Sequence, residues 1–191
     1  AKAYSSVVLV TIGTGVGGGV IIDNKIYTGF NYAGAELGHM IIVANGRRCS
    51  CGLKGCWEAY SSATALIKMT QEAMDRNQDT ILWAMCNGNT NAVNGRTAFN
   101  AMRQGDLVAA EVIYSYIDYL ACGIINIINI FCPEVLSIGG GISNEKERLL
   151  DMLLPRIGLR IYSSNSAQRT LIKIAELGND AGIIGAAALH C

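Results

Sequence analysis

Four side chains that commonly bind metals lie close together in this sequence: His39, Cys49, Cys51 and Cys56. One imidazole and three thiolates form a ligand set that closes a tetrahedral shell around Zn²⁺. Four protein ligands leave no open position for water, so such a zinc would be structural rather than catalytic. The spacing therefore predicts a structural zinc site within a loop that spans residues 36–58.

The alternatives for these cysteines are a disulfide or ordinary free thiols. Cys49 and Cys51 are too close in sequence for an unstrained disulfide with each other. Seven cysteines are an odd number, and the sequence shows no secretory signal peptide, so a disulfide framework is disfavoured. We favour zinc over free thiols and expect a reducing, cytoplasmic location.

Two carboxylates, Glu36 and Glu58, flank the metal-ligand residues. A rigid metal site would hold these groups and the ring of His39 in fixed directions. The alternative is that both glutamates are solvated surface charges and that His39 is only a metal ligand, because glutamate is mostly exposed in folded proteins.

Two glycine-rich segments could bind phosphate. Residues 13–19 follow a predicted strand, and backbone N–H groups without a Cβ nearby can cradle phosphate oxygens, with the Thr14 hydroxyl as a further donor. Residues 139–141 lie between a strand and a helix N-terminus, where an anion or nucleotide is favoured. The alternatives are a plain hairpin turn for the first segment and close strand-to-helix packing for the second.

The composition indicates one globular domain. Hydrophobic residues make up 51% of the 191 residues, and fifteen basic residues balance fifteen acidic ones. A balanced charge favours neither nucleic acid nor an anionic membrane as a partner. The longest apolar stretch, residues 120–131, is interrupted by Asn126 and Asn129 and is too short to span a bilayer.

The apolar periodicity predicts an α/β fold in which helices pack on a sheet. The predicted strands are residues 7–12, 20–22, 26–28, 135–138 and 171–175, the first three being antiparallel neighbours joined by a glycine-rich turn. The predicted helices are residues 62–76, 97–104, 106–130, 144–157 and 180–189. Asn144 with Glu147 is typical of a capping box at the start of the fourth helix.

Together these motifs resemble the ROK family of sugar kinases and sugar-responsive repressors. The matching segments are residues 13–19, 33–39, 49–58, 126–134 and 138–143. The resemblance implies an actin-like, ribonuclease-H-like ATPase fold, and residues 1–191 match only its second, C-terminal lobe. We expect the N-terminal phosphate motif, the first sugar-binding segment and the catalytic Asp to precede Ala1.

The resemblance also implies a role for each candidate residue. Glu36 and Glu58 would accept hydrogen bonds from sugar hydroxyls, and His39 would bind zinc with one ring nitrogen and face the sugar with the other. The residues approaching the transferred phosphate would be Gly13, Thr14, Gly15 and Gly17. Those on the adenosine side would be Gly139, Gly140 and Gly141.

The resulting interpretation is the C-terminal lobe of an ATP-dependent hexose kinase of glucokinase type, with Zn²⁺, ATP and Mg²⁺ as cofactors. Glucose is the expected hexose, the fragment alone is expected to be inactive, and a homo-oligomer is expected. One alternative is the effector domain of a sugar-responsive repressor, although the phosphate hairpin favours a kinase. Another is an isolated zinc-stabilised interaction module.

Overall fold

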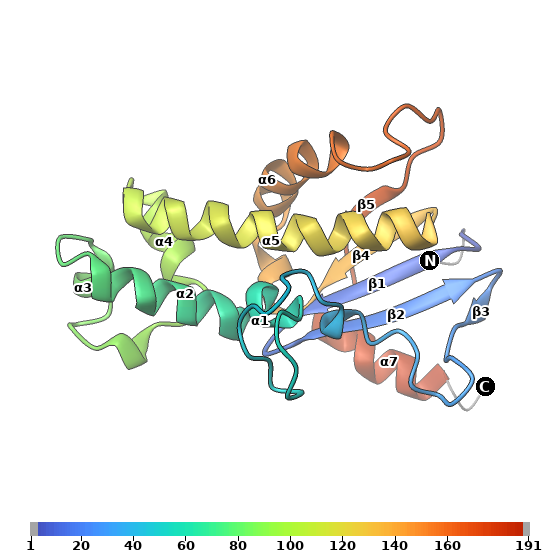
Figure 1. Cartoon of the computed structure of the whole chain (residues 1–191), viewed down its shortest axis with the longest axis horizontal. Helices are drawn as coiled ribbons and strands as arrows, with labels where there is room; N and C mark the ends of the chain where they lie inside the picture. Colours follow the sequence, from blue (N-terminus) through green and yellow to red (C-terminus); the bar gives the residue numbers. More distant parts are fainter. Residues whose placement is uncertain (1–3, 189–191) are drawn as a thin grey trace.

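The centre of the fold is a five-stranded mixed sheet with the strand order β3-β2-β1-β4-β5 (Figure 1). The computed structural model describes residues 4–188. The strands are β1 (Val7–Ile12), β2 (Val16–Ile22), β3 (Lys25–Ile26), β4 (Val135–Gly139) and β5 (Leu171–Ile174). β1, β2 and β3 are antiparallel neighbours, as predicted, whereas β4 and β5 run parallel to β1. The α/β prediction is confirmed.

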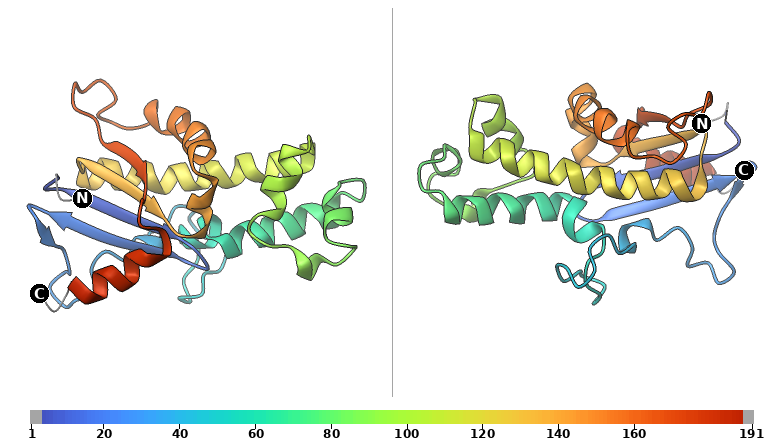
Figure 2. Two further views of the ribbon diagram at one scale, coloured as in Figure 1. Left: turned by 180° about the vertical axis from the view of Figure 1, so that it is seen from behind. Right: turned by 45° about the horizontal axis from the view of Figure 1, so that its top comes forward.

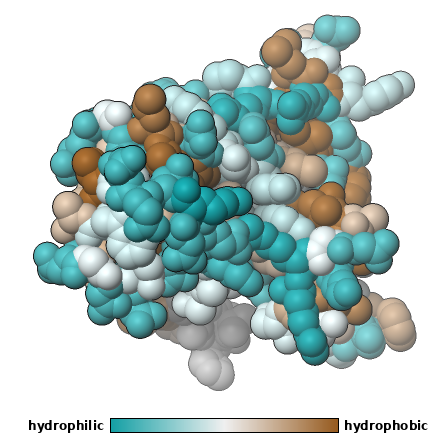
Figure 3. Space-filling model, turned by 60° about the vertical axis from the view of Figure 1, so that its left-hand side comes forward, coloured by the Kyte–Doolittle hydropathy of each residue, from teal (hydrophilic) through white to brown (hydrophobic). Residues whose placement is uncertain are grey.

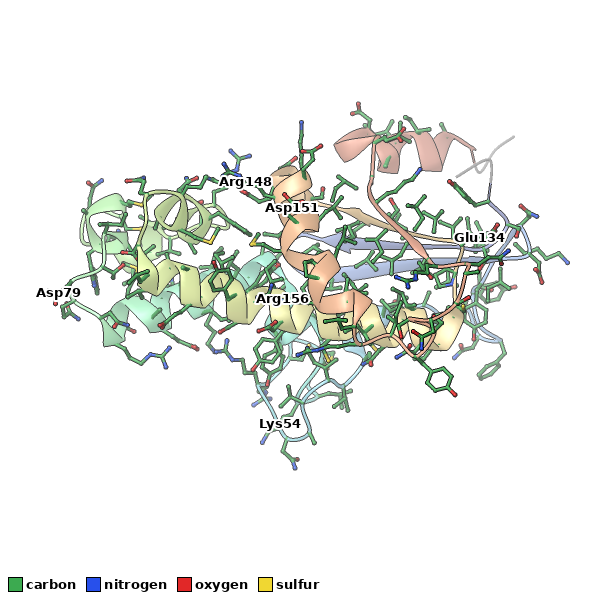
Figure 4. All side chains as sticks on the ribbon, turned by 90° about the horizontal axis from the view of Figure 1, so that it is seen from above. Lys54, Asp79, Glu134, Arg148, Asp151 and Arg156 are labelled. Carbon is green, nitrogen blue, oxygen red and sulfur yellow. The ribbon has the colours of Figure 1, made fainter. Side chains whose placement is uncertain are left out.

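One face of the sheet forms the main core because apolar residues alternate along its central strands. Val8, Val10 and Ile12 of β1 are almost completely buried, and the parallel register places Val8 opposite Leu136 and Val10 opposite Ile138 of β4. Two helices, α5 (Leu107–Phe131) and α6 (Glu147–Gly158), cover this face. The last helix, α7 (Ala181–Ala188), lies on the opposite side of the sheet (Figure 4).

The remaining helices extend away from the sheet along α5. They are α1 (Glu58–Ser61), α2 (Ala63–Arg76), α3 (Leu82–Met85) and α4 (Thr97–Arg103). Residues 4–188 also contain four short 3₁₀ turns: η1 (Leu37–His39), η2 (Thr90–Ala92), η3 (Gly141–Glu145) and η4 (Gly178–Asp180). Figure 2 shows α2 and α5 side by side, with α3 and α4 at the end far from the sheet. That end is largely hydrophilic, and its apolar side chains lie in separate patches (Figure 3).

α5 has 25 residues and is long and apolar enough to cross a membrane by length and composition alone. The apolar stretch noted in the sequence, residues 120–131, is only the second half of this helix, which continues through Asn126 and Asn129 without a break. Tyr116, Ile117, Leu120 and Ile124 are fully buried against the sheet and the neighbouring helices. This burial is that of a core helix in a globular domain.

The glycine-rich turn is shorter than predicted, because only residues 13–15 form the turn. Gly17, Gly18 and Gly19 belong to β2 and pair with β1. A Cβ on Gly18 would lie 2.6 Å from the carbonyl oxygen of Ala35 and 2.7 Å from Leu37. Glycine is required here because the chain around η1 crosses directly over the strand.

The capping box predicted at Asn144 is wrong. Residues 141–145 form η3, and α6 begins only at Glu147, after Lys146 with a φ of 52°. The side chain of Ser143 donates a hydrogen bond to the carbonyl oxygen of Gly140 at 2.7 Å, which closes a tight turn before the helix can start. β3 ends at Ile26 rather than at residue 28, and the last helix begins at Ala181, while its predicted end, Leu189, lies outside the described residues.

Asp106 begins α5 and also holds the chain that precedes α3. Its carboxylate accepts hydrogen bonds from the N–H of Ala109 at 2.7 Å, the hydroxyl of Thr80 at 2.8 Å and the N–H of Ile81 at 2.9 Å. Partial burial works to raise the pKa of Asp106, but these hydrogen bonds outweigh it and lower the pKa.

We expect Asp106→Ala to lower the free energy of unfolding by about 2 kcal/mol, because it removes a helix cap and two further hydrogen bonds. A lowered folded-state pKa stabilises the fold above the unfolded value of about 3.9, and this contribution is lost as the pH falls through the folded-state pKa. Urea unfolding should therefore show the full difference at pH 7 and a shrinking one below about pH 4. Asp151→Ala, an exposed change on α6 (Figure 4), is the control, and an equal effect there would contradict the assignment.

Candidate functional site

The predicted metal ligands lie in a loop that folds back on itself between η1 and α1. Two isolated β-bridges close the loop, one between Ile41 and Cys56 and the other between Arg48 and Lys54. Gly55 has a φ of +84°, and a Cβ there would lie 1.8 Å from the carbonyl oxygen of Val43. The tight return of the chain therefore requires glycine at this position.

This fold brings together all four predicted ligands, whose nitrogen and sulfur atoms lie within 4.8 Å of one another. The Sγ atoms of Cys51 and Cys56 are 3.7 Å apart, and Cys49 Sγ lies 3.7 Å from His39 Nδ1. A tetrahedral zinc with Zn–S bonds of about 2.3 Å would separate two thiolates by roughly 3.8 Å. The spacing and chemistry of the four donors therefore fit a zinc ion.

Ionisation of the Cys56 thiol is unfavourable because the thiol is buried and lies close to two other thiols. Burial, together with the neighbouring Cys51 and Cys49, raises the pKa of Cys56 to about 12. Metal binding requires the thiolate form, so a bound cation has to compensate this unfavourable ionisation.

Trp57 anchors the loop to the protein core. Its ring is fully buried, and its Nε1–H donates a hydrogen bond to the carbonyl oxygen of Tyr119 at 3.0 Å. A Cβ on Gly123 of α5 would lie only 2.0 Å from the indole ring. The indole thus packs directly on the bare backbone of the core helix and fixes the residues on both sides of it.

Glu58, the next residue, joins the cysteine loop to the glycine turn. Its Oε2 accepts a hydrogen bond from the N–H of Val16 at 2.9 Å, and its Oε1 accepts one from the hydroxyl of Ser50 at 2.9 Å. A Cβ on Gly15 would lie 2.4 Å from Oε2, so glycine at this position leaves room for the carboxylate. Partial burial works to raise the pKa of Glu58, but the hydrogen bonds and the nearby His39 outweigh it and lower the pKa. Glu58 is therefore an ionised hydrogen-bond acceptor at neutral pH.

A cleft of about 540 Å³ opens beside this carboxylate. One wall is the glycine turn at Thr14 and Gly15, and a second is the loop at residues 47–50. The third wall is the first part of α2, where the N–H of Ala63 donates to the carbonyl oxygen of Gly13 at 2.8 Å. The cleft therefore brings a hydroxyl, a carboxylate and backbone N–H groups into one space.

The other candidate residues near the loop do not line this cleft. Glu36 is exposed at the start of η1, and His39 is half-buried with its Nδ1 toward the cysteines. A Cβ on Gly38, between them, would lie 2.1 Å from the carbonyl oxygen of Val16. η1 therefore lies tightly against β2. Gly17 lies within β2 opposite Thr11.

In the second glycine segment, residues 139–141, the first two glycines pack against β1 and the third is open to solvent. Gly139 ends β4 opposite Thr11, and Gly140 has a φ of +84° with its Cα against the backbone of Ile12, where a Cβ would come within 2.5 Å. Gly141 has open space around it and lines a pocket of about 440 Å³ together with Arg96 and the start of α2. Residue 140 therefore has to be glycine so that the chain can pack against β1, whereas Gly141 is accessible to a ligand.

Several polar residues that line this cleft were not predicted from the sequence, among them Arg47, Arg48, Ser50, Thr64 and Lys68. Ser50 lies inside the cysteine motif, and its contact with Glu58 depends on the fold of the loop. Lys68 lies one turn beyond Thr64 on α2, and its only sequence signal is a cation at a polar helix position. Their common location follows from tertiary structure alone.

The fold and the site together define an α/β domain that joins a histidine–cysteine cluster to a glycine hairpin through a carboxylate. The sequence profile of the ROK family matches residues 1–191. The chain therefore belongs to the ROK family, as the motifs predicted.

Individual relatives are similar over nearly the whole chain. A glucokinase from Thermotoga maritima is 35% identical over 188 residues, covering 98% of this chain and 59% of that protein. A ROK family glucokinase from Streptomyces griseus, solved in complex with glucose and AMPPNP, superimposes with a TM-score of 0.88 and 32% identity over 97% of this chain and 60% of its own. The xylose repressor of Bacillus subtilis is 31% identical over 191 residues, covering 99% of this chain and 45% of the repressor. The chain thus spans about 60% of the length of these glucokinases.

The Trp57 anchor leads to a stability prediction. Gly123→Ala should lower the free energy of unfolding by roughly 3 kcal/mol, because the new Cβ would overlap the indole ring. Gly158→Ala is the matched control, since that glycine lies at the end of α6 with open space around it and should be neutral or slightly stabilising. Chemical unfolding followed by tryptophan fluorescence measures both. A neutral Gly123→Ala variant would contradict the anchoring role.

Proposed function

We propose that this chain is the C-terminal lobe of an ATP-dependent hexose kinase of glucokinase type, with the actin-like ATPase fold. The proposal is supported by the contact between Glu58 and the glycine hairpin, because a carboxylate can accept hydrogen bonds from sugar hydroxyls and a glycine-rich turn can cradle phosphate oxygens. The glucokinase from Streptomyces griseus, which was solved with glucose and AMPPNP, has the same fold in this region.

In this proposal the chain binds and orients both substrates. Glu58, Glu36 and the free nitrogen of His39 hold the hydroxyls of a hexose, with glucose as the expected sugar. Thr14 and Gly15 lie along the transferred phosphoryl group, and Gly17 supports the strand behind them. The sugar hydroxyl oxygen forms a bond to the γ-phosphorus of ATP while the bond to the β,γ-bridging oxygen breaks. The hydroxyl proton passes to an Asp that we assign to the N-terminal lobe.

The nucleotide would extend from the hairpin toward the second glycine segment. The pocket at Gly141 also contains Asn94 and Arg96, which offer an amide and a guanidinium to the adenosine side of ATP. Gly139 and Gly140 would keep the chain close to β1 so that this pocket remains open. Mg²⁺ enters the proposal as the counter-ion of ATP, and no side chain of this chain is assigned to it.

We further propose that zinc binds His39, Cys49, Cys51 and Cys56, where it would fix the loop that carries Glu58. The purified chain should contain close to one zinc per molecule. Cys51→Ser should lower the zinc content and reduce the free energy of unfolding by more than about 3 kcal/mol, because structural zinc contributes directly to folding. Metal analysis and urea unfolding measure the two effects. Cys132→Ser, at an exposed cysteine outside the cluster, is the control, and equal behaviour of the two variants would contradict zinc binding.

A coupled assay with ATP, Mg²⁺ and a panel of hexoses tests the kinase proposal on the longer protein that contains this sequence. We expect turnover with one hexose, with at least about 100-fold less from the 191-residue chain alone, because a general base contributes a factor of that order. Glu58→Gln should reduce kcat/KM at least about tenfold, whereas Glu111→Gln, at an exposed position on α5, should leave it unchanged. Full turnover by the chain alone would contradict the lobe assignment.

The second candidate function is the effector domain of a sugar-responsive repressor, which the similarity to the xylose repressor of Bacillus subtilis supports. Sugar binding by the longer protein without ATP turnover would favour this function. In either case we expect a cytoplasmic protein that assembles as a homo-oligomer and contacts neither membrane nor nucleic acid through this domain.

A further inference from the structure

The glycine turn between β1 and β2 needs contacts from elsewhere in the fold to fix the direction of its peptide groups. Glycine at positions 13 and 15 flanks both peptide bonds of Thr14, so either peptide group can reverse its direction with little steric cost. A peptide group is planar and trans, and its N–H and C=O therefore point in opposite directions. Contacts outside the turn have to determine which of these groups faces a ligand.

The first two residues of α2 supply these contacts. The N–H of Ala63 donates a hydrogen bond to the carbonyl oxygen of Gly13 at 2.8 Å. The hydroxyl of Thr64 donates one to the carbonyl oxygen of Thr14 at 2.7 Å. The third carbonyl oxygen, that of Gly15, accepts the N–H of Gly13 at 3.0 Å. All three carbonyl groups of the turn therefore have donors, and two of these donors come from one helix.

The direction of the free N–H groups follows from these hydrogen bonds. Because the carbonyl group of Thr14 points to Thr64, the N–H of Gly15 at the other end of the same peptide group points away from that side chain. The N–H groups of Thr14 and Gly15 have no hydrogen-bond partner within residues 4–188. They remain available as donors, whereas the carbonyl oxygens of residues 13 and 14 are turned toward the helix.

We propose that Thr64 is a positioning residue for phosphoryl transfer. Its hydroxyl holds the peptide group between Thr14 and Gly15 so that the N–H, and not the carbonyl oxygen, is presented to the transferred phosphoryl group. The inference rests on the proposed kinase function and adds to it a residue that acts through the turn. A reversed peptide group would remove one donor and would direct a carbonyl oxygen at the phosphate oxygens, which also carry negative charge.

Amide hydrogen exchange of the 191-residue chain, followed for single residues by NMR, tests this role without any turnover. Thr64→Val keeps the size and branching of the side chain and removes only the hydroxyl. Exchange at Gly13 and Ala63, whose N–H groups bond to the turn, should become at least about threefold faster, since one hydrogen bond that opposes local opening is lost. Thr64→Ser keeps the hydroxyl and should exchange as the unaltered chain does.

Thr170→Val is the matched control. The hydroxyl of Thr170 also donates to a carbonyl oxygen at 2.7 Å, that of Pro133. Pro133 lies just before Val135, which pairs with Val7 at the start of β1, so this hydrogen bond lies roughly 20 Å from the turn, given about 3.3 Å per strand residue. Thr170→Val should not change exchange at the turn. Unchanged exchange in Thr64→Val, or an equal increase in both valine variants, would overturn the inference.

The coupled assay on the longer protein tests the consequence for the reaction. Thr64→Val should lower kcat/KM for ATP at least about tenfold, because a misdirected donor weakens stabilisation of the transition state, and should leave KM for the hexose unchanged. Thr64→Ser should restore kcat/KM, and Thr170→Val should not alter it.

The two proposals fail in different ways. Turnover by the longer protein with an unchanged kcat/KM for ATP in Thr64→Val would reject this inference and leave the kinase proposal intact. No turnover by the unaltered longer protein would contradict the kinase proposal instead, and the exchange rates would then decide whether Thr64 holds the turn.

Discussion

The contact between Trp57 and Gly123 determines where the cysteine loop lies. The indole is buried in the core and rests on a helix backbone that has no side chain at the contact point. Its hydrogen bond to the carbonyl oxygen of Tyr119 sets the orientation of the ring. Because Cys56 precedes Trp57 and Glu58 follows it, one buried side chain positions both a candidate metal ligand and the central carboxylate of the site.

Glu58 in turn connects the cysteine loop to the glycine hairpin through hydrogen bonds. One carboxylate oxygen binds the N–H of Val16 at the start of β2, and the other binds the hydroxyl of Ser50 inside the cysteine loop. The missing side chain at Gly15 allows this approach. The sheet, the loop and the first turn of α2 are thereby connected around a single cleft, and a change in any of them would alter the distance between carboxylate and hairpin.

The parts of the structure that depend on local signals could be predicted from the sequence. Periodicity predicted α2 and α5 correctly, and ligand spacing predicted that His39 and the three cysteines would come together. The start of α6 was missed because a hydrogen bond from Ser143 to Gly140 competes with helix formation there.

The remaining features depend on neighbours that are distant in sequence. Gly18 and Gly123 resemble ordinary strand and helix glycines until the segments that lie against them are known. Likewise, Arg48 and Lys68 are unremarkable surface cations in the sequence and become neighbours of one cleft only after the loop packs beside α2. Sequence patterns therefore located the histidine–cysteine cluster and the hairpin, whereas the charge around the cleft required the tertiary structure.

We propose that a structural zinc fixes the loop that carries Glu58. X-ray absorption at the zinc edge, recorded on the protein purified without added metal or chelator, measures the ligands of this zinc. We expect three sulfur ligands at about 2.3 Å and one nitrogen ligand at about 2.0 Å. A shell of oxygen and nitrogen ligands without sulfur, or no zinc signal above background, would contradict it.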